Sequence, residues 1–162
     1  RQALARPYDA VFEMDCDFSH NPDDLLRLTA ELEAGADVAV GSRYSKGVTV
    51  VNWPMSRLLM SYCASRYVRI VTGMPVCDAT AGFVGYKREV LAAIDFDRIE
   101  MVGYGFQIEM KYTAWKMGFR IGEVPIIFAD RTEGTSKMSG GIFGEAFFGV
   151  LALPFRTIAR KK

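Results

Sequence analysis

Two acidic side chains one position apart are the residues whose types and spacing most directly predict chemistry. An apolar run at residues 10–12 leads into Asp15 and Asp17, which flank Cys16. Mg²⁺ and Mn²⁺ are hard cations that prefer carboxylate and phosphate oxygens, and one ion can bridge a protein carboxylate and a diphosphate. The pair therefore predicts a divalent metal site. An ordinary acidic turn is the alternative, since this spacing is common by chance.

The residues that follow predict the start of a helix. Asn21 can cap a helix that Pro22 opens, and the aspartates at 23 and 24 suit its positive end. The acidic pair would then lie at the carboxyl edge of a strand, where open α/β sheets bind ligands. His20 is the only histidine, and its place beside a helix start favours a structural contact over a catalytic role.

The elements that must position these residues alternate between strand and helix, which predicts an α/β sheet. Strands are expected at residues 8–14, 37–41, 83–86 and 121–128. Helices are expected at residues 22–34, 54–71, 89–93 and 105–116, with a short helix-like tail at 2–5 and a loop at 45–52. In the first long helix, the leucines at 25, 26, 28 and 32 are expected to form the buried face.

Composition limits the class of protein. A chain of 162 residues that is 50% hydrophobic can form one domain with a sizeable core. A net charge of +1 gives no case for nucleic-acid binding through bulk electrostatics. Three cysteines without a pairing pattern favour reduced thiols in the cytosol. Because the sequence has no run of about 20 uncharged apolar residues, we expect any membrane association to be peripheral.

Five segments, in this order and spacing, resemble one enzyme family. They are residues 12–22, 41–44 (Gly-Ser-Arg-Tyr), 78–83 (Asp-Ala-Thr-Ala-Gly-Phe), 103–109 (Gly-Tyr-Gly-Phe-Gln-Ile-Glu) and 130–137, which contains Asp-Arg and Gly-Thr-Ser-Lys. The chain resembles the polyprenol-phosphate mannosyltransferases, also called dolichol-phosphate mannose synthases, of inverting GT-A glycosyltransferase family 2. The resemblance implies a Rossmann-like GT-A α/β domain.

The resemblance also shows a departure from the family pattern. In that family, an opening strand with a Pro-Thr-Tyr-Asn-Glu type motif and a second strand with a base-contacting aspartate precede the metal segment, and neither is present here. We therefore expect residues 1–139 to form a partial GT-A catalytic domain that lacks its N-terminal nucleotide-binding strands. Residues 140–162 are expected to add a C-terminal amphipathic helix to the same domain.

The resemblance assigns the acidic segment to the donor and the metal. It implies that Asp15, Cys16 and Asp17 contact the donor, with Cys16 acting through its backbone as a small residue at the strand end. It implies Mg²⁺ or Mn²⁺ held by Asp15 and Asp17. Ser19 stands where relatives often carry a glutamine ligand, so its hydroxyl is either a weaker metal ligand or a partner for nearby backbone.

The resemblance assigns Arg43, Arg57 and Ser61 to the phosphate of a lipid acceptor. Arg43 follows a strand end, and its planar fork matches phosphate oxygens. Arg57 and Ser61 are four residues apart on the expected helix, so they share a face and can grip one phosphate. Without the resemblance, both arginines read as ordinary surface cations.

Further residues close the expected site. In the family, Arg131 and Lys137 meet the donor diphosphate from a turn-rich loop, for which a disordered basic loop is the alternative. Asp78 is a candidate catalytic residue, either as a general base or, more in keeping with an acceptor that is already an anion, by orienting the sugar or the helix that carries Arg57. Glu109 is expected to fix neighbouring cations.

The C-terminal stretch carries a different pattern. Apolar residues between 142 and 155 are interrupted by Glu145 and Pro154, and cations follow at 156 and 160–162. The pattern fits a helix at the membrane interface, and it also fits a helix packed on the core. A polyprenyl substrate favours the first interpretation, a helix at the membrane interface.

The implied reaction transfers mannose from GDP-mannose to a polyprenyl phosphate with inversion, by a cytoplasmic protein that is peripheral at the inner face of the membrane. One alternative is a transferase that uses a UDP-sugar with the same kind of acceptor. Another is a non-catalytic, membrane-associated remnant that serves a partner. The missing base-binding strands are where the donor base would be read.

Overall fold

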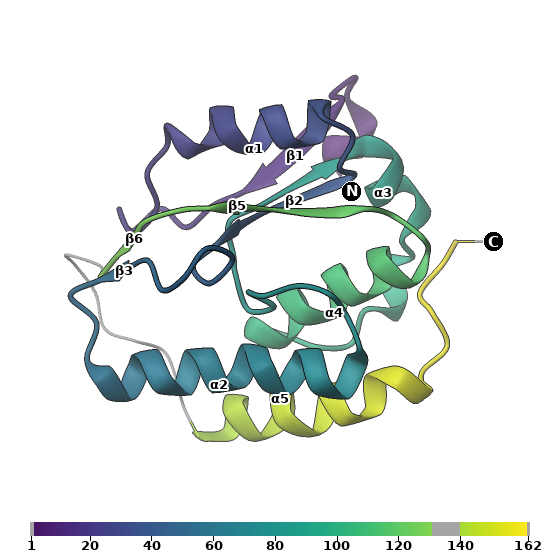
Figure 1. The fold of residues 1–162 in the computed structure, drawn as a ribbon. Coiled ribbons are helices and arrows are strands. Elements are labelled where there is room, and N and C mark those ends of the chain that lie inside the picture. The colour runs from purple at the N-terminus through teal and green to yellow at the C-terminus, as the bar shows by residue number, and fades with distance from the viewer. Residues whose placement is uncertain (1, 131–139, 162) are drawn as a thin grey trace.

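The computed structural model describes residues 2–130 and 140–161, and its centre is a four-stranded mixed sheet (Figure 1). The strand order is β1 (Ala10–Glu13), β4 (Val84–Lys87), β2 (Val38–Ser42) and β5 (Ile121–Pro125). β4 is antiparallel to both neighbours, whereas β2 and β5 are parallel. Consequently β1, β2 and β5 all run toward the same edge of the sheet.

The register of the sheet brings the acidic segment level with the chain before β4. Glu13 pairs with Val84, and Val84 pairs with Val40 on β2. Because β4 runs in the opposite direction, Asp15 and Gly82 lie at the same height just beyond the paired residues. The acidic pair therefore stands at the carboxyl edge of the sheet, as the sequence predicts.

Helices cover both faces of the sheet (Figure 1). α1 (Asp24–Glu33) covers one face, and α3 (Arg88–Ala93) and α4 (Tyr104–Lys116) cover the other. α2 (Met55–Thr72) and α5 (Gly140–Ala152) lie side by side beyond α4. Short 3₁₀ turns occupy Gln2–Ala5, Phe96–Arg98 and Leu153–Phe155.

Three apolar clusters hold these layers together. On the α1 side, Leu28 and Leu32 pack against Phe83 and Ile126. Leu26 is 76% exposed, so the expected buried face of this helix is narrower than the leucine pattern indicates. On the other face, side chains of β2 and β4 pack on α3 and α4, and the third cluster joins α2, α4 and α5. Burial of these faces is the main favourable term in folding.

Two expected boundaries change for identifiable reasons. The first long helix begins at Asp24 because the turn before it closes over three residues, with Asp24 donating to Asn21 O at 3.1 Å and Leu25 to Pro22 O at 3.0 Å. Asn21 caps this turn, since its side-chain oxygen accepts the backbone N–H of Asp23 at 3.1 Å. The strand expected at 121–128 divides because Ile126 donates to Ser42 on β2, whereas Phe128 donates to Thr49. This change of partner creates β6 (Phe128–Ala129), which pairs in parallel with β3 (Val50–Val51) inside the expected loop.

The helices differ from membrane spans. Across residues 2–130 and 140–161, none of them is both long enough and apolar enough to cross a bilayer.

Candidate functional site

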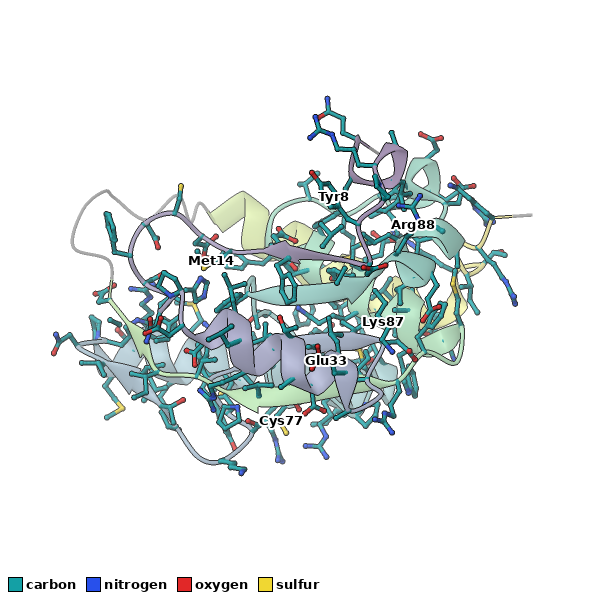
Figure 2. All side chains as sticks on the ribbon, turned by 90° about the horizontal axis from the view of Figure 1, so that it is seen from above. Tyr8, Met14, Glu33, Cys77, Lys87 and Arg88 are labelled. Atoms are coloured by element: carbon teal, nitrogen blue, oxygen red, sulfur yellow. The ribbon has the colours of Figure 1, made fainter. Side chains whose placement is uncertain are left out.

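The acidic pair lies on a tight turn just past β1. Figure 2 shows Met14 at the end of β1 away from Tyr8 and Arg88, which places the turn at the carboxyl edge. Phe18 has a φ of 62°, a left-handed conformation that bulky residues rarely adopt, and its side chain is 83% exposed. Ser19 donates to Asp17 Oδ1 from its backbone N–H at 3.1 Å and from its hydroxyl at 2.5 Å. The chain therefore reverses direction directly after the pair.

His20 supports this turn from inside. Its side chain is buried, and its Nδ1 accepts the backbone N–H of Asp15 at 3.3 Å. The ring packs between Phe83 and Phe128, each with a centroid distance of 5.0 Å. Burial lowers the pKa of His20, although the nearby carboxylates of Asp15 and Asp17 oppose the shift. His20 thus has the structural contact that its position predicts, but nothing in the sequence alone indicates that Asp15 is its partner.

The acidic turn suits a hard divalent cation. The carboxylate of Asp15 is exposed, and its oxygens lie 3.8 and 3.9 Å from the position that a Cβ on Gly82 would take. Within the described residues, no group of three or more His, Cys, Asp or Glu side chains is arranged to hold a metal. A divalent metal held by Asp15 and Asp17 stays a prediction, and such an ion would take its remaining ligands from phosphate and water. Cys16 is exposed between them, and the hydroxyl of Ser19 is directed at Asp17.

Arg43 and Asp78 form a buried ion pair under the site. Arg43 donates from Nε to Asp78 Oδ2 at 2.7 Å and from Nη2 to Oδ1 at 2.6 Å, and Nη2 also reaches Thr80 at 2.9 Å. Burial alone would lower the pKa of Arg43, but the bonded carboxylate outweighs it and raises the pKa. Asp78 is completely buried, so it is placed to position other groups and is out of reach of a substrate. A phosphate contact by Arg43 stays a prediction.

Glu123 is a supporting residue that the sequence reasoning missed. From β5, its carboxylate accepts the backbone N–H groups of Cys77 at 2.8 Å and Asp78 at 3.0 Å. A glutamate within a strand carries no sequence signal for a contact with a segment 45 residues away. It fixes the backbone that presents Asp78 to Arg43.

The acceptor residues expected on α2 do share one face. Arg57 binds Asp130 Oδ1 at 2.5 Å, and its guanidinium lies 4.0 Å above the ring of Trp53. Ser61 accepts the hydroxyl proton of Tyr44 at 2.8 Å. Since Ser61 acts as the acceptor in that bond, its own O–H makes no hydrogen bond within the described part of the chain.

β6 connects the acidic turn to α2. The backbone N–H of Ala129 donates to the carbonyl of Ser19 at 3.3 Å. Phe128 contacts His20 on one side and Trp53 on the other, the second pair with centroids 5.3 Å apart. The structure therefore brings the expected metal residues and Arg57 to one edge of the molecule. Arg131 and Lys137, which the sequence assigns to the donor diphosphate, lie outside the described residues.

Gln107 and Glu109, near the start of α4, contact different parts of the molecule. Gln107 donates from Nε2 to Glu13 Oε1 at 2.6 Å, next to the acidic turn. Burial raises the pKa of Glu13, and the hydrogen bond from Gln107 works against that rise. Glu109 faces away from the turn and binds Arg156, so the expectation that it fixes a cation is confirmed.

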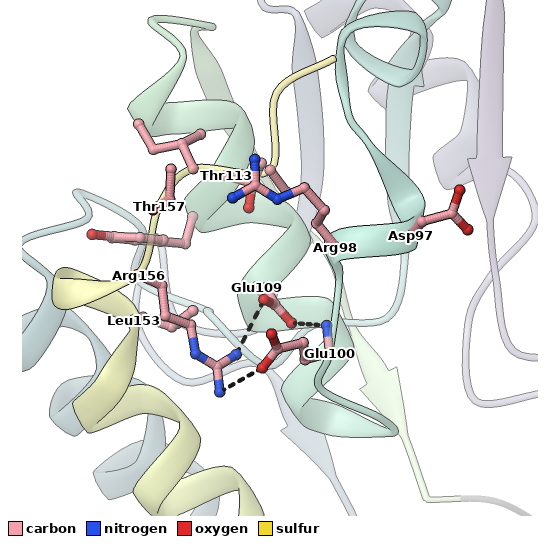
Figure 3. Close-up of a pocket in the computed structure, with 11 residues that line it drawn as sticks. Asp97, Arg98, Glu100, Glu109, Thr113, Leu153, Arg156 and Thr157 are labelled. Carbon is pink, nitrogen blue, oxygen red and sulfur yellow. Dashed lines mark hydrogen bonds and ion pairs between the residues drawn. The ribbon is translucent and has the colours of Figure 1, made fainter. Parts of the chain in front are cut away.

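A cavity surrounds Glu109 (Figure 3), and no residue of the acidic turn lines it. It has a volume of about 330 Å³ and is lined by the 3₁₀ turn at 96–98, by α4 and by the C-terminal segment. Arg156 occupies it, bonded to Glu100 at 3.1 Å and to Glu109 at 3.4 Å. Apart from Glu109, none of the described residues that the sequence assigns to the donor, the metal or the acceptor lines this cavity.

Comparison with solved structures identifies the fold. Glucosyl-3-phosphoglycerate synthase from Mycobacterium tuberculosis in complex with phosphoglyceric acid matches 95% of this chain and 53% of its own, with a TM-score of 0.67 and 16% identity. The same enzyme in complex with Mn²⁺, UDP-glucose and glycerol 3-phosphate matches 94% of this chain and 50% of its own, with a TM-score of 0.61 and 17% identity. The GT-A fold expected from the sequence is confirmed.

Closer relatives are found by sequence. The undecaprenyl-phosphate mannosyltransferase of Micrococcus luteus is 48% identical over 150 residues, which is 93% of this chain and 61% of the relative. The polyprenol monophosphomannose synthase of Mycolicibacterium smegmatis is 48% identical over 147 residues, which is 91% of this chain and 56% of the relative. The chain thus spans little more than half of these curated relatives. Residues 6–95 match the family described as Glycosyl transferase family 2. The chain belongs to glycosyl transferase family 2.

Proposed function

We propose that this chain forms part of a polyprenol-phosphate mannosyltransferase that transfers mannose from GDP-mannose to a polyprenyl phosphate. The observation that carries the proposal is the 48% identity to two bacterial enzymes named for this kind of product. The placement of the acidic turn and Arg57 at one edge of the sheet supports it.

The donor side of the site is the acidic turn. Asp15 and Asp17, with Ser19 as a further ligand, would hold Mg²⁺ or Mn²⁺, which supplies charge neutralisation for the departing diphosphate. His20 fixes the backbone of Asp15, and the Ser19 hydrogen bonds fix the carboxylate of Asp17. Cys16 contributes its backbone to the donor. Arg131 and Lys137 are proposed to close over the same diphosphate and to stabilise it as it leaves.

The acceptor side lies along α2. Arg57 is proposed to bind the lipid phosphate, held ready by Asp130 and by the ring of Trp53, and Ser61 to donate its free O–H to a phosphate oxygen. Arg43 is proposed to add positive charge near the same lipid phosphate. A phosphate oxygen attacks the anomeric carbon from the face opposite the diphosphate. The bond from this carbon to the diphosphate oxygen breaks, and the departing diphosphate takes the electron pair. The configuration therefore inverts.

This attack needs no general base. A phosphate monoester has a second pKa of about 6, so the acceptor is already a nucleophilic anion at neutral pH. The full burial of Asp78 agrees with that chemistry, because no carboxylate is required to take a proton from the acceptor.

Exposed apolar side chains on the paired helices α2 and α5 provide a proposed contact with the cytoplasmic face of the membrane. Phe148 is 70% exposed on α5 and Phe155 is 90% exposed just after it, while Val150 and Leu153 are buried in the core. The C-terminal helix therefore has one face packed and one face exposed. Arg160 and Lys161 follow and suit anionic lipid. We expect Phe148→Asp with Phe155→Asp to reduce sedimentation with phosphatidylglycerol vesicles, whereas Leu26→Asp on α1 leaves it unchanged.

Assay of the full-length protein tests the proposed reaction. With Mn²⁺ and a short polyprenyl phosphate, we expect transfer from GDP-mannose to exceed transfer from UDP-glucose. The second candidate, a UDP-sugar transferase, is favoured by the likeness in fold to an enzyme bound to UDP-glucose. Preference for UDP-glucose would select that candidate, and no transfer from either donor would favour the non-catalytic alternative.

A further inference from the structure

A buried lysine lies beneath the acidic turn and has no part in the proposed chemistry. Lys111 of α4 is completely buried, and its Nζ donates to the carbonyl of Ala81 at 2.6 Å. Burying an ammonium group without a paired carboxylate is costly, and an apolar side chain of similar length would fill the same space without that cost. A lysine at this place therefore calls for an explanation beyond packing.

The bond from Lys111 fixes a segment that has no regular secondary structure. Residues 77–83 are the last part of the connection from α2 to β4 and contain no helix or strand, so backbone hydrogen bonds alone do not define their path. Charged side chains from other elements hold them instead. Arg43 binds the carboxylate of Asp78, Glu123 accepts two backbone N–H groups, and Lys111 holds the carbonyl of Ala81.

The end of this segment lies next to Asp15. Gly82 directly follows Ala81, and a Cβ there would lie 3.8 Å from Asp15 Oδ2, an ordinary van der Waals distance. A shift of the Ala81 carbonyl would therefore move the backbone that lies next to the first carboxylate of the pair. Arg43 and Glu123 act on residues 77, 78 and 80, whereas Lys111 acts on the residue next to Gly82.

We infer that Lys111 is a positioning residue that sets the metal-binding geometry of Asp15 through Ala81 and Gly82. The inference rests on the proposed function only in that Asp15 binds a divalent metal with a nucleoside diphosphate. Partners in the outer shell of a metal site typically change metal affinity by about 10- to 100-fold when they are lost. We expect an effect near the lower end, because Lys111 acts through the backbone.

Mn²⁺ binding to the full-length protein in the presence of GDP, followed by electron paramagnetic resonance, tests this role. Lys111→Met is expected to raise the Kd for Mn²⁺ about tenfold, while the thermal midpoint stays the same or rises because a buried charge has been removed. Lys116→Met is the matched control, since Lys116 is exposed on the same helix and packs on Tyr112 and Trp115. It should leave the Kd unchanged.

The possible results separate this inference from the proposed function. Wild-type affinity for Mn²⁺ in Lys111→Met would overturn the role of Lys111 and leave the proposed reaction untouched. A lower midpoint, with weaker binding only in proportion to the unfolded fraction, would also overturn it, because Lys111 would then be structural. If the wild-type protein bound no Mn²⁺ with GDP, the metal site itself would be absent and both proposals would fall.

Discussion

The backbone N–H of Asp15 donates to Nδ1 of His20, so the backbone that carries the first carboxylate of the acidic turn is held by a side chain just before α1. The imidazole also fills the space between Phe83 and Phe128. One residue therefore couples the shape of the turn to the core on the α1 side of the sheet.

Replacing His20 separates these two tasks. His20→Phe keeps an aromatic ring but removes the acceptor, so we expect a loss of about 1 kcal/mol in the free energy of unfolding, the typical value of one hydrogen bond. His20→Asn keeps an acceptor near the position of Nδ1 but loses ring packing. Urea unfolding measures both. If His20→Phe were as stable as the wild type, the hydrogen bond to Asp15 would have no role in holding the turn.

Replacing Asp15 and replacing Asp17 should change the free energy of unfolding by different amounts, although both replacements should abolish activity. Within the described residues the Asp15 carboxylate makes no hydrogen bond or ion pair, so Asp15→Ala should leave the free energy of unfolding nearly unchanged. Asp17→Ala removes the acceptor of two Ser19 hydrogen bonds and should cost about 1–2 kcal/mol. Both variants should lose metal-dependent transfer across a Mn²⁺ titration. Near-normal turnover at saturating metal in either variant would contradict the metal assignment.

Removal of Arg57 should affect the acceptor more than the donor. Loss of a charge-assisted phosphate contact costs about 1.5–3 kcal/mol, which corresponds to a tenfold or larger kinetic change. We expect Arg57→Ala to raise the KM for polyprenyl phosphate and to leave the KM for GDP-mannose unchanged. Arg66→Ala, an exposed arginine on the same helix, is the control. A change confined to the donor would show that the division of the site is wrong.

Asp78 should behave as a structural residue. Removing one partner of a buried ion pair leaves an uncompensated charge and typically costs about 3–5 kcal/mol. We therefore expect Asp78→Asn to lower the free energy of unfolding strongly, since Arg43 stays buried beside it. Joint replacement, Arg43→Met with Asp78→Leu, should cost less than the single change. An Asp78→Asn protein with wild-type stability but no transfer would restore a direct catalytic role.

The burial of Lys111 predicts a dependence of stability on pH. Burial lowers the pKa of Lys111 from 10.5 to about 7, while Asp78, Glu13 and Glu123 act to raise it and Arg43 acts to lower it further. Between about pH 7 and 10.5 the unfolded chain binds a proton that the folded chain has lost, so the contribution of this group to stability rises with pH. Below pH 7 the ammonium is charged in both states and its burial cost is fully present.

Unfolding of the wild type and Lys111→Met at several pH values measures this contribution. The difference between the two proteins isolates Lys111 from the other groups that titrate in the same range. We expect the free energy of unfolding of the wild type to increase relative to that of Lys111→Met as the pH rises from 7 to 10. A constant difference would show that Lys111 keeps its proton in the folded protein.

The sequence predicts what depends on local pattern. The alternation of strands and helices, the turn after β1 and the shared face of Arg57 and Ser61 follow from spacing along the chain, and the structure has them. Leu26 shows the limit of this reasoning, because an apolar residue in the right register is exposed when no element covers it.

Contacts between distant residues are not encoded in local pattern. Arg43 meets Asp78 across 35 residues, and Glu123 meets the same segment across 45. Pairing of this kind depends on strand order, and the central place of the antiparallel strand β4 cannot be read from periodicity. For this reason the sequence identifies the chemical types at the site but does not indicate that Arg43 and Asp78 are buried together as an ion pair.

That central antiparallel strand also sets a length. Adjacent strands stand about 4.8 Å apart, so the ends of β1 and β2, with β4 between them, are separated by about 10 Å. This span is fixed by the hydrogen-bond ladder of the main chain, and no side-chain replacement alters it. Exchange of residues at either strand end can therefore change the side chains presented there, whereas the spacing between the two strand ends stays set by the backbone.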